Sequence, residues 1–281
     1  MSKTESVLPI LRCLTEAFKF SGSESVKAVT DTQKEFLREF FCSIKEADSP
    51  FLDGKADADV GVINAWLKER GFDIKLQECP GNAFSVAAVL DALVEWEGEA
   101  SSSSISKEGK TYPAVRIKNG VDICRLSDGN FYLRLRTKSG VYVNIAVTDR
   151  PEGWKWPIHS SVRLVENKTS TISPFNGAVL FPKISKDEFT DIAFLRGLKM
   201  GSLYIGEAVQ QNRFRMNEKG ARAQSAAGIS LRCSTFNRDP LICIDEPFLL
   251  WMSEPGKVLP LFCGWFETDS WKEPSDISGK R

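Results

Sequence analysis

Residues 217–228 read NEKGARAQSAAG, a run of small side chains that follows a charged start and a glycine. Side chains of this size can be accepted between two existing strands of a β-sheet. The next residues, 230–240, have no sustained apolar period, whereas 241–252 and 258–266 are dense in β-branched, aromatic and aliphatic residues and are predicted to be strands. Connections longer than about 12 to 15 residues are uncommon in compact domains unless they are functional or disordered. We therefore predict an exposed loop between two strands, with a first half suited to becoming a strand itself.

Composition alone also fits a second interpretation of 221–228, as a flexible tether or a short alanine-rich helix. The flanking segments favour the loop. They are GAVLFPKISKDEFTDIAFLRGLKMG (177–201), SLYIGEAVQQNRFRMNEKG (202–220) and the pair DEPFL (245–249) and LFCGW (261–265), with INAWLKERGFDIK (63–75) and AFSVAAVLDALVEW (83–96) upstream. In order and spacing these segments resemble the serpin family. The resemblance makes 177–201 a strand, short helix and turn, 202–220 a long strand leading into the hinge, and the last two a closing strand pair. It makes 63–75 the helix across the main sheet and 83–96 the central strand beneath it.

The resemblance implies an α+β fold. It would contain one large, mainly antiparallel sheet with packed helices, additional small sheets and an exposed reactive loop. We expect residues 1–281 to form a single serpin-like domain, in which 1–62 is a shortened N-terminal helical part and 217–241 is the hinge and reactive loop.

The resemblance also implies a function. In the family, a protease attacks the reactive loop as a substrate and forms an acyl-enzyme, and the cut loop then inserts into the main sheet as a new strand and distorts the enzyme. The chain would accordingly be a protease inhibitor and not an enzyme, monomeric, with a serine or cysteine protease as its partner. The alternative is a binding or decoy protein of serpin fold that no longer traps proteases.

The family pattern also assigns site residues. The hinge would comprise Glu218, Lys219, Gly220, Ala221, Ala223, Ser225, Ala226 and Ala227. The family's spacing from the hinge glutamate places the reactive bond at Ser234-Thr235, whereas chemistry favours Arg232-Cys233, because an arginine offers a trypsin-like protease a long cation. Both alternatives stay open.

Several departures from the family pattern favour the non-inhibitory alternative. Arg222 stands in place of an acidic hinge residue, and Gln224 in place of an alanine. Gln210 and Asp91 replace a histidine and an asparagine that form a hydrogen-bonded gate in the sheet. The part before residue 63 is also much shorter than the family's, so helices of the rear core are expected to be missing.

Composition argues against several other classes of protein. Because 37 Lys and Arg balance 37 Asp and Glu, no broad basic surface for nucleic acid or an anionic membrane is expected. No run approaches the roughly 18 apolar residues of a membrane span. The first 20 residues lack the uninterrupted apolar core of a signal peptide. We therefore expect a cytoplasmic protein, or an extracellular one that is exported by an unconventional route.

Catalytic and metal-binding motifs are absent from the sequence. His159 is the only histidine, no G-x-S-x-G elbow or phosphate-binding glycine loop occurs, and we expect His159 on the surface or in a loop. Seven scattered cysteines without a Cys-x-x-Cys pair favour neither a disulfide framework nor a metal site. We predict no cofactor and no metal.

Hydrophobic periodicity predicts helices over 6–20 and 30–41, the second capped by Thr30 or Asp31. It predicts strands over 115–117, 121–126, 131–136 and 141–147. Hairpin turns are expected at Asn119-Gly120, Asp128-Gly129 and Ser139-Gly140, which would give an antiparallel meander. The tract ASSSS (100–104) is predicted to be a flexible connector.

Overall fold

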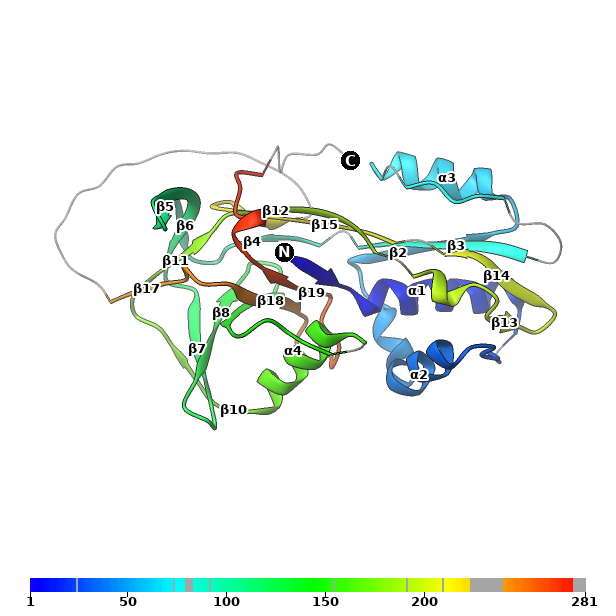
Figure 1. Ribbon diagram of the computed structural model, residues 1–281, viewed down its shortest axis with the longest axis horizontal. Helices are drawn as coiled ribbons and strands as arrows, with labels where there is room; N and C mark the ends of the chain where they lie inside the picture. The colour runs from blue at the N-terminus through cyan, green and yellow to red at the C-terminus, as the bar shows by residue number, and fades with distance from the viewer. Residues whose placement is uncertain are drawn as a thin grey trace. The chain divides into compact units, whose positions relative to one another are not determined.

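The protein is described by a computed structural model over residues 1–23, 25–72, 74–78, 83–90, 92–153, 155–190, 192–208, 210–222 and 240–274 (Figure 1). The chain forms two compact units. Among the described residues, unit 1 comprises Met1–Glu5, Ala92–Lys186 and those from Arg213 onward, and unit 2 comprises those within Ser6–Asp91 and Asp187–Asn212. That 1–281 folds as a single domain stays a prediction.

Unit 2 is built on a four-stranded sheet with a helix on each face. The strand order is β13 (Lys199–Met200), β14 (Leu203–Ala208), β3 (Ala83–Leu90) and β2 (Leu52–Asp57). Helix α1 (Val7–Ser21) lies on one face and α3 (Val60–Glu69) on the other (Figure 1). β14 and β3 run parallel, whereas the two outer strand pairs are antiparallel.

Helix α1 confirms the helix predicted over 6–20. Leu8, Leu11 and Leu14 recur at the spacing of one helix face and are fully buried. Gly22 ends the helix in the left-handed conformation, at a φ of 64°. The sheet approaches the helix so closely at Gly54 that a Cβ there would lie 2.9 Å from the Cγ atom of Arg12, so β2 needs a glycine at this position.

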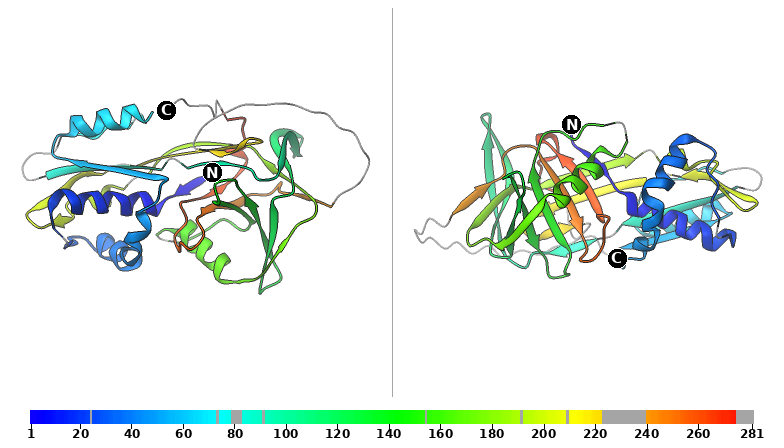
Figure 2. Two further views of the ribbon diagram at one scale, coloured as in Figure 1. Left: turned by 180° about the vertical axis from the view of Figure 1, so that it is seen from behind. Right: turned by 90° about the horizontal axis from the view of Figure 1, so that it is seen from below.

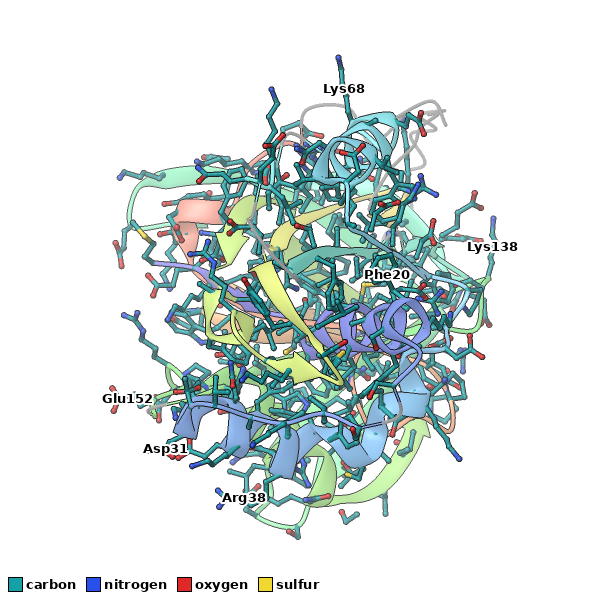
Figure 3. All side chains as sticks on the ribbon, turned by 90° about the vertical axis from the view of Figure 1, so that its right-hand side faces the viewer. Phe20, Asp31, Arg38, Lys68, Lys138 and Glu152 are labelled. Carbon is teal, nitrogen blue, oxygen red and sulfur yellow. The ribbon has the colours of Figure 1, made fainter. Side chains whose placement is uncertain are left out.

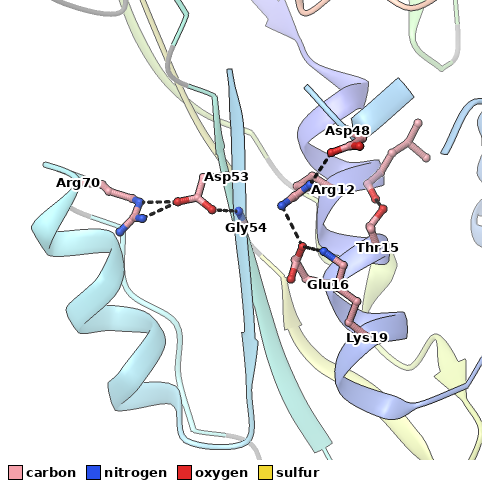
Figure 4. A network of polar contacts seen from close by, with 9 residues as sticks. Arg12, Thr15, Glu16, Lys19, Asp48, Asp53, Gly54 and Arg70 are labelled. Carbon is pink, nitrogen blue, oxygen red and sulfur yellow. Dashed lines mark hydrogen bonds and ion pairs between the residues drawn. The ribbon is translucent and has the colours of Figure 1, made fainter. Parts of the chain in front are cut away.

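Polar contacts surround helices α1 and α3 (Figure 4). Within α1, Glu16 pairs with Arg12 at 3.1 Å and with Lys19 at 2.8 Å. At the end of α3, Arg70 pairs with Asp53 on β2 at 2.5 Å and lies 4.3 Å from the ring centre of Trp66. The Arg70–Asp53 pair is partly exposed to solvent, and exposed ion pairs contribute at most about 1 kcal/mol. Burial of apolar side chains on α3 therefore holds the helix to the sheet, and the pairs fix its position.

The apolar face of α3 includes Ile63 and Leu67, which are buried against Val89 of β3. Lys68 points away from the helix into solvent (Figure 3). The helix predicted over 63–75 begins three residues earlier and ends at Glu69. It stops there because Gly71 adopts the left-handed conformation, with a φ of 76°.

Helix α2 (Asp31–Phe40) confirms the second predicted helix and its cap, and a 3-10 helix (Phe41–Ala47) follows it. The Thr30 side chain accepts a hydrogen bond from the Gln33 backbone, and the Gln33 side chain accepts one from the Thr30 backbone, which completes a capping box. The Gln33 amide also donates to the carbonyl oxygens of Phe194 and Arg196. One buried side chain thus caps the helix and anchors it to a distant segment of the same unit.

Unit 1 contains an antiparallel seven-stranded sheet (Figure 2). Its order is β1 (Lys3–Glu5), β19 (Phe262–Phe266), β18 (Phe248–Ser253), β9 (Tyr142–Val147), β8 (Phe131–Arg136), β7 (Val121–Leu126) and β10 (Thr169–Pro174). Helix α4 (Pro157–Asn167) packs on it through Ile158 and Val162, which share a buried cluster with Trp251. The predicted meander and its turns at Asp128-Gly129 and Ser139-Gly140 are confirmed by β7, β8 and β9.

A second, four-stranded sheet of unit 1 corrects two predictions. Its order is β17 (Leu241–Cys243), β11 (Ala178–Pro182), β6 (Lys110–Lys118) and β5 (Glu99–Lys107). The tract 100–104 is not a connector but part of β5, because its backbone pairs with β6 along its whole length. Asn119-Gly120 is not a hairpin turn, since it joins β6 of this sheet to β7 of the seven-stranded sheet. Both residues adopt positive φ, which the abrupt turn requires.

His159 is fully buried in α4, so the prediction of a surface or loop position is wrong. Its backbone N–H donates to the Glu5 carboxylate at 3.0 Å. Burial, with a smaller contribution from the charge of Arg163, lowers the pKa of His159 to about 4. The helix face that packs on the sheet therefore carries a neutral imidazole.

We expect the stability of the protein to fall as the pH drops from about 6.5 to about 4. The unfolded chain binds a proton to His159 in this range and the folded chain does not, so the stabilisation is complete above pH 6.5 and is lost progressively below it. A shift of this size corresponds to about 3 kcal/mol. Urea unfolding of wild type and His159→Gln at several pH values measures the effect. Parallel pH profiles for the two proteins would contradict it.

Candidate functional site: the hinge strand

The start of the predicted loop forms a strand with a partner on each side. β16 (Gly220–Arg222) pairs antiparallel with β15 (Gln210–Asn217) and with β4 (Leu93–Glu95), in a sheet of order β12 (Ile184–Thr190), β15, β16, β4. Ala221 is opposite Met216 on one side and Val94 on the other. The first residues of the loop are therefore already inserted between two strands. The single strand predicted over 83–96 is two strands, β3 and β4, in different sheets.

The turn between β15 and β16 is fixed by side-chain contacts. Asn217 accepts a hydrogen bond from the Lys219 backbone N–H through its Oδ1 atom, at 2.9 Å. The indole N–H of Trp96 donates to the Asn217 carbonyl oxygen, also at 2.9 Å. Trp96 is itself buried and meets the ring of Phe181 edge-on. A rigid aromatic anchor thus holds the turn from outside the hairpin.

Small residues in β16 are required by the space available. A Cβ on Gly220 would lie 1.9 Å from the carbonyl oxygen of Val94, so no side chain fits without moving the backbone. Ala221 is fully buried, as are its neighbours Met216 and Val94. The hinge therefore fits its place in the sheet only because Gly220 and Ala221 are small.

An ion cluster lies at the same turn. The ammonium of Lys183 pairs with Glu218 at 2.7 Å and with Glu273 at 2.9 Å. Burial opposes a charge on Lys183, but hydrogen bonds and charge from the two carboxylates outweigh it and raise the pKa of the lysine above its usual value. Burial would likewise raise the pKa of Glu218, but the contact with Lys183 outweighs it and the pKa lies below its usual value. Lys183 and Glu218 are thus both charged near neutral pH.

Gln210 is buried at the start of β15, in unit 2, where the family pattern has a histidine. Its amide nitrogen donates to the carbonyl oxygen of Ser6 at 3.1 Å and to the Oδ1 atom of Asn212 at 3.0 Å. A hydrogen-bonded link from this strand to the segment before α1 is therefore present with a glutamine. Asp91, its predicted partner, lies outside the described residues.

The described residues include half of the predicted hinge. Glu218, Lys219, Gly220 and Ala221 come together at the turn and in β16. The remaining predicted site residues lie outside the described part of the chain: Ala223, Ser225, Ala226, Ala227, Arg232, Cys233, Ser234 and Thr235.

Sequence reasoning missed three residues that hold the turn, Lys183, Trp96 and Glu273. In the family the apolar strand of the segment that resembles 177–201 ends in Leu-Pro-Lys, here Phe181-Pro182-Lys183, which was a signal for the lysine. The end of the 83–96 segment was a signal for Trp96. No sequence pattern pointed to Glu273.

Other kinds of site find no support in the part of the chain that the structure describes. There, no group of three or more His, Cys, Asp or Glu residues is placed to hold a metal ion. No described helix is long and apolar enough to cross a membrane. The five described cysteines, Cys13, Cys42, Cys124, Cys243 and Cys263, are free thiols.

Comparison with known proteins identifies one family that the chain resembles. Residues 178–268 match the family model of the serpins, the serine protease inhibitors. No curated protein sequence matches the chain.

Solved serpin structures superpose on most of the chain. Mouse protein Z-dependent protease inhibitor gives a TM-score of 0.59 at 12% identity, over 94% of this chain and 90% of its own. Uncleaved ovalbumin gives 0.59 at 14% identity, over 94% and 92%, and thyroxine-binding globulin in complex with thyroxine gives 0.58 at 14%, over 97% and 93%. The predicted α+β serpin fold is therefore confirmed. By its fold, and by the family match over 178–268, the chain is a serpin-like protein.

Proposed function

We propose that the chain inhibits proteases by presenting the loop within 217–241 as bait to a serine or cysteine protease and inserting the cut loop into its sheet. In this proposal the chain itself is not an enzyme. The observation that carries it is β16, in which the loop's first residues are hydrogen-bonded as a strand between β15 and β4.

The register of β16 supports further insertion. If β16 continued by one residue in this register, Ala223 would lie opposite Phe214 of β15 on one side and opposite Ala92, the residue before β4, on the other. Phe214 and Ala92 are both buried. A methyl side chain suits such a position, and the following loop residues are also small. Addition of a strand gains main-chain hydrogen bonds on both edges, which can supply work against a bound protease.

A second candidate, a binding protein of serpin fold that traps no protease, is favoured by one feature of the same hairpin. Arg222 is directly opposite Arg215 in the register of β16 and β15. Like charges at opposite positions destabilise a strand pair, which works against insertion. Thyroxine-binding globulin, whose solved structure is a complex with thyroxine, shows that the fold also occurs in a protein that binds a small molecule.

The proposed function is tested by incubating the protein with a panel of serine and cysteine proteases and running the products on a denaturing gel. We expect a complex with at least one protease that survives SDS, because the trapped enzyme remains joined to the cut loop as an ester or thioester. Mass spectrometry of the released C-terminal fragment then distinguishes cleavage at Arg232-Cys233 from cleavage at Ser234-Thr235.

The control is the same protease with its nucleophile replaced by alanine, which cannot form the covalent bond. Rapid cleavage of the loop by active proteases without any stable complex would reject inhibition and favour the binding protein.

A further inference from the structure

The buried ammonium of Lys183 has two carboxylate partners from segments far apart in the sequence. Glu218, in the hinge turn, places its Oε2 atom 2.7 Å from Nζ, and Glu273 places its two oxygens 2.9 and 3.0 Å away. Only 3% of the Lys183 side chain is exposed, so water contributes little to the stability of its charge. The two carboxylates therefore decide whether the cation is stable in its position.

Glu273 is held beside Lys183 by the packing of the preceding residues. Trp271 is buried, meets the ring of Tyr112 edge-on at 5.3 Å, and stacks on Phe248 at 6.3 Å. Its backbone forms an antiparallel bridge with Ile184, the residue that follows Lys183. The Glu273 side chain is 60% exposed. Its contact with the buried Lys183 is nevertheless favoured by the backbone position, which the packing of Trp271 and the bridge to Ile184 fix.

The second partner changes the free-energy cost of moving the hinge. Removing the only partner of a buried charge is strongly destabilising, because the charge is left neither paired nor hydrated. If Glu218 were the only carboxylate on Lys183, opening of the turn would leave the ammonium in that state. With Glu273 in place, Lys183 keeps one partner when Glu218 departs. The mutual repulsion of the two carboxylates is also relieved.

We propose that Glu273 is a positioning residue for the hinge, which keeps Lys183 paired when Glu218 moves away and so makes the turn easier to open. The C-terminal segment 271–274 and the start of the loop are thereby coupled through one lysine. The consequence for protease trapping rests on the proposed function, whereas the opening of the turn occurs without any protease and is measured separately.

Amide hydrogen exchange of Gly220, Ala221 and Arg222, measured by NMR on the full chain, tests the proposal. Glu273→Gln is expected to slow their exchange about tenfold or more, because opening then strands a buried cation. Glu218→Gln is expected to speed exchange, because the turn loses its tether. In the Glu218→Gln background, the further change Glu273→Gln should not slow the exchange of these amides. If Glu273 had a merely structural role, its replacement would speed the exchange of these amides. The sign of the change therefore distinguishes a structural role from the proposed one.

The matched control is Glu95→Gln, which alters an exposed pair with Lys138 at the residue opposite Gly220. It should leave exchange unchanged, and the buried amides of β18 report any change in the stability of the whole unit. Unchanged or faster exchange of β16 in Glu273→Gln overturns the proposal, as does equal slowing in the Glu218→Gln background. If the glutamine variant fails to fold, Glu273→Ala carries the same expectation. A protein with the expected exchange pattern that traps no protease refutes only the proposed function.

Discussion

Replacement of Ala221 by glutamate is expected to turn the protein from a protease trap into a protease substrate. Ala221 is fully buried in β16 between Met216 and Val94, and a carboxylate at this position would be desolvated without a partner. The hinge would leave the sheet and the cut loop would not re-enter it, while cleavage of the exposed loop would continue. Because trapping competes with simple hydrolysis of the acyl-enzyme, we expect the SDS-resistant complex to vanish and the cleaved chain to accumulate in its place.

Lys219→Glu is the matched control, because it introduces the same charged group two residues away, in the turn and not in the buried strand. This variant should still form the complex. The stoichiometry of inhibition, measured by titrating a fixed amount of protease, quantifies both outcomes. Wild-type stoichiometry in Ala221→Glu would exclude loop insertion as the mechanism.

A single cut between residues 232 and 235 is expected to raise the melting temperature by tens of degrees. The freed loop can extend β16 along β15 and along the residues that precede β4, which adds backbone hydrogen bonds on two edges and buries small side chains such as Ala223. For a chain of this size, about 1 kcal/mol changes the melting temperature by roughly 2 to 4 °C, so a shift of this size requires on the order of 10 kcal/mol. Circular dichroism of intact and cut protein measures it.

The position of the cut must be verified by mass spectrometry before the two melts are compared. A chain cut at a site outside the loop is the control and should melt at or below the temperature of the intact protein. If the loop-cut protein behaves like this control, the intact fold stores no strain, and the binding protein becomes the better interpretation.

The parts of the fold that sequence predicted well are those governed by local chemistry. Strands β7 and β8 were predicted with the bounds they have, because alternating apolar residues are followed by Asp128-Gly129, a dipeptide suited to a tight turn. The cap at Thr30 follows from the same kind of short-range signal, since the capping box needs only residues three apart. The hinge was identifiable because its residues had to be small.

The errors concern features that distant residues determine. The serine tract 100–104 has the composition of a linker, and it is a strand only because β6 supplies a partner for its backbone. Asn119-Gly120 has the local conformation of a tight turn, but the sheets on its two sides are chosen by tertiary pairing. The contact of Glu273 with Lys183 spans 90 residues, and no local pattern encodes it.

The pairing of β1 with β19 determines when the chain can finish folding. Lys3 is opposite Trp265, and Glu5 is opposite Cys263, so one edge of the seven-stranded sheet joins residues about as distant in sequence as the chain allows. A nascent chain that has exposed everything up to β9 still lacks β18 and β19, the two strands that separate β9 from β1. During synthesis, β9 therefore remains an open edge, and β1 has no partner until residues 262–266 emerge. Because the sheet closes late, the edges of β1 and β9 stay unpaired during most of synthesis. Pairing of these edges with another chain is then the principal reaction that competes with folding.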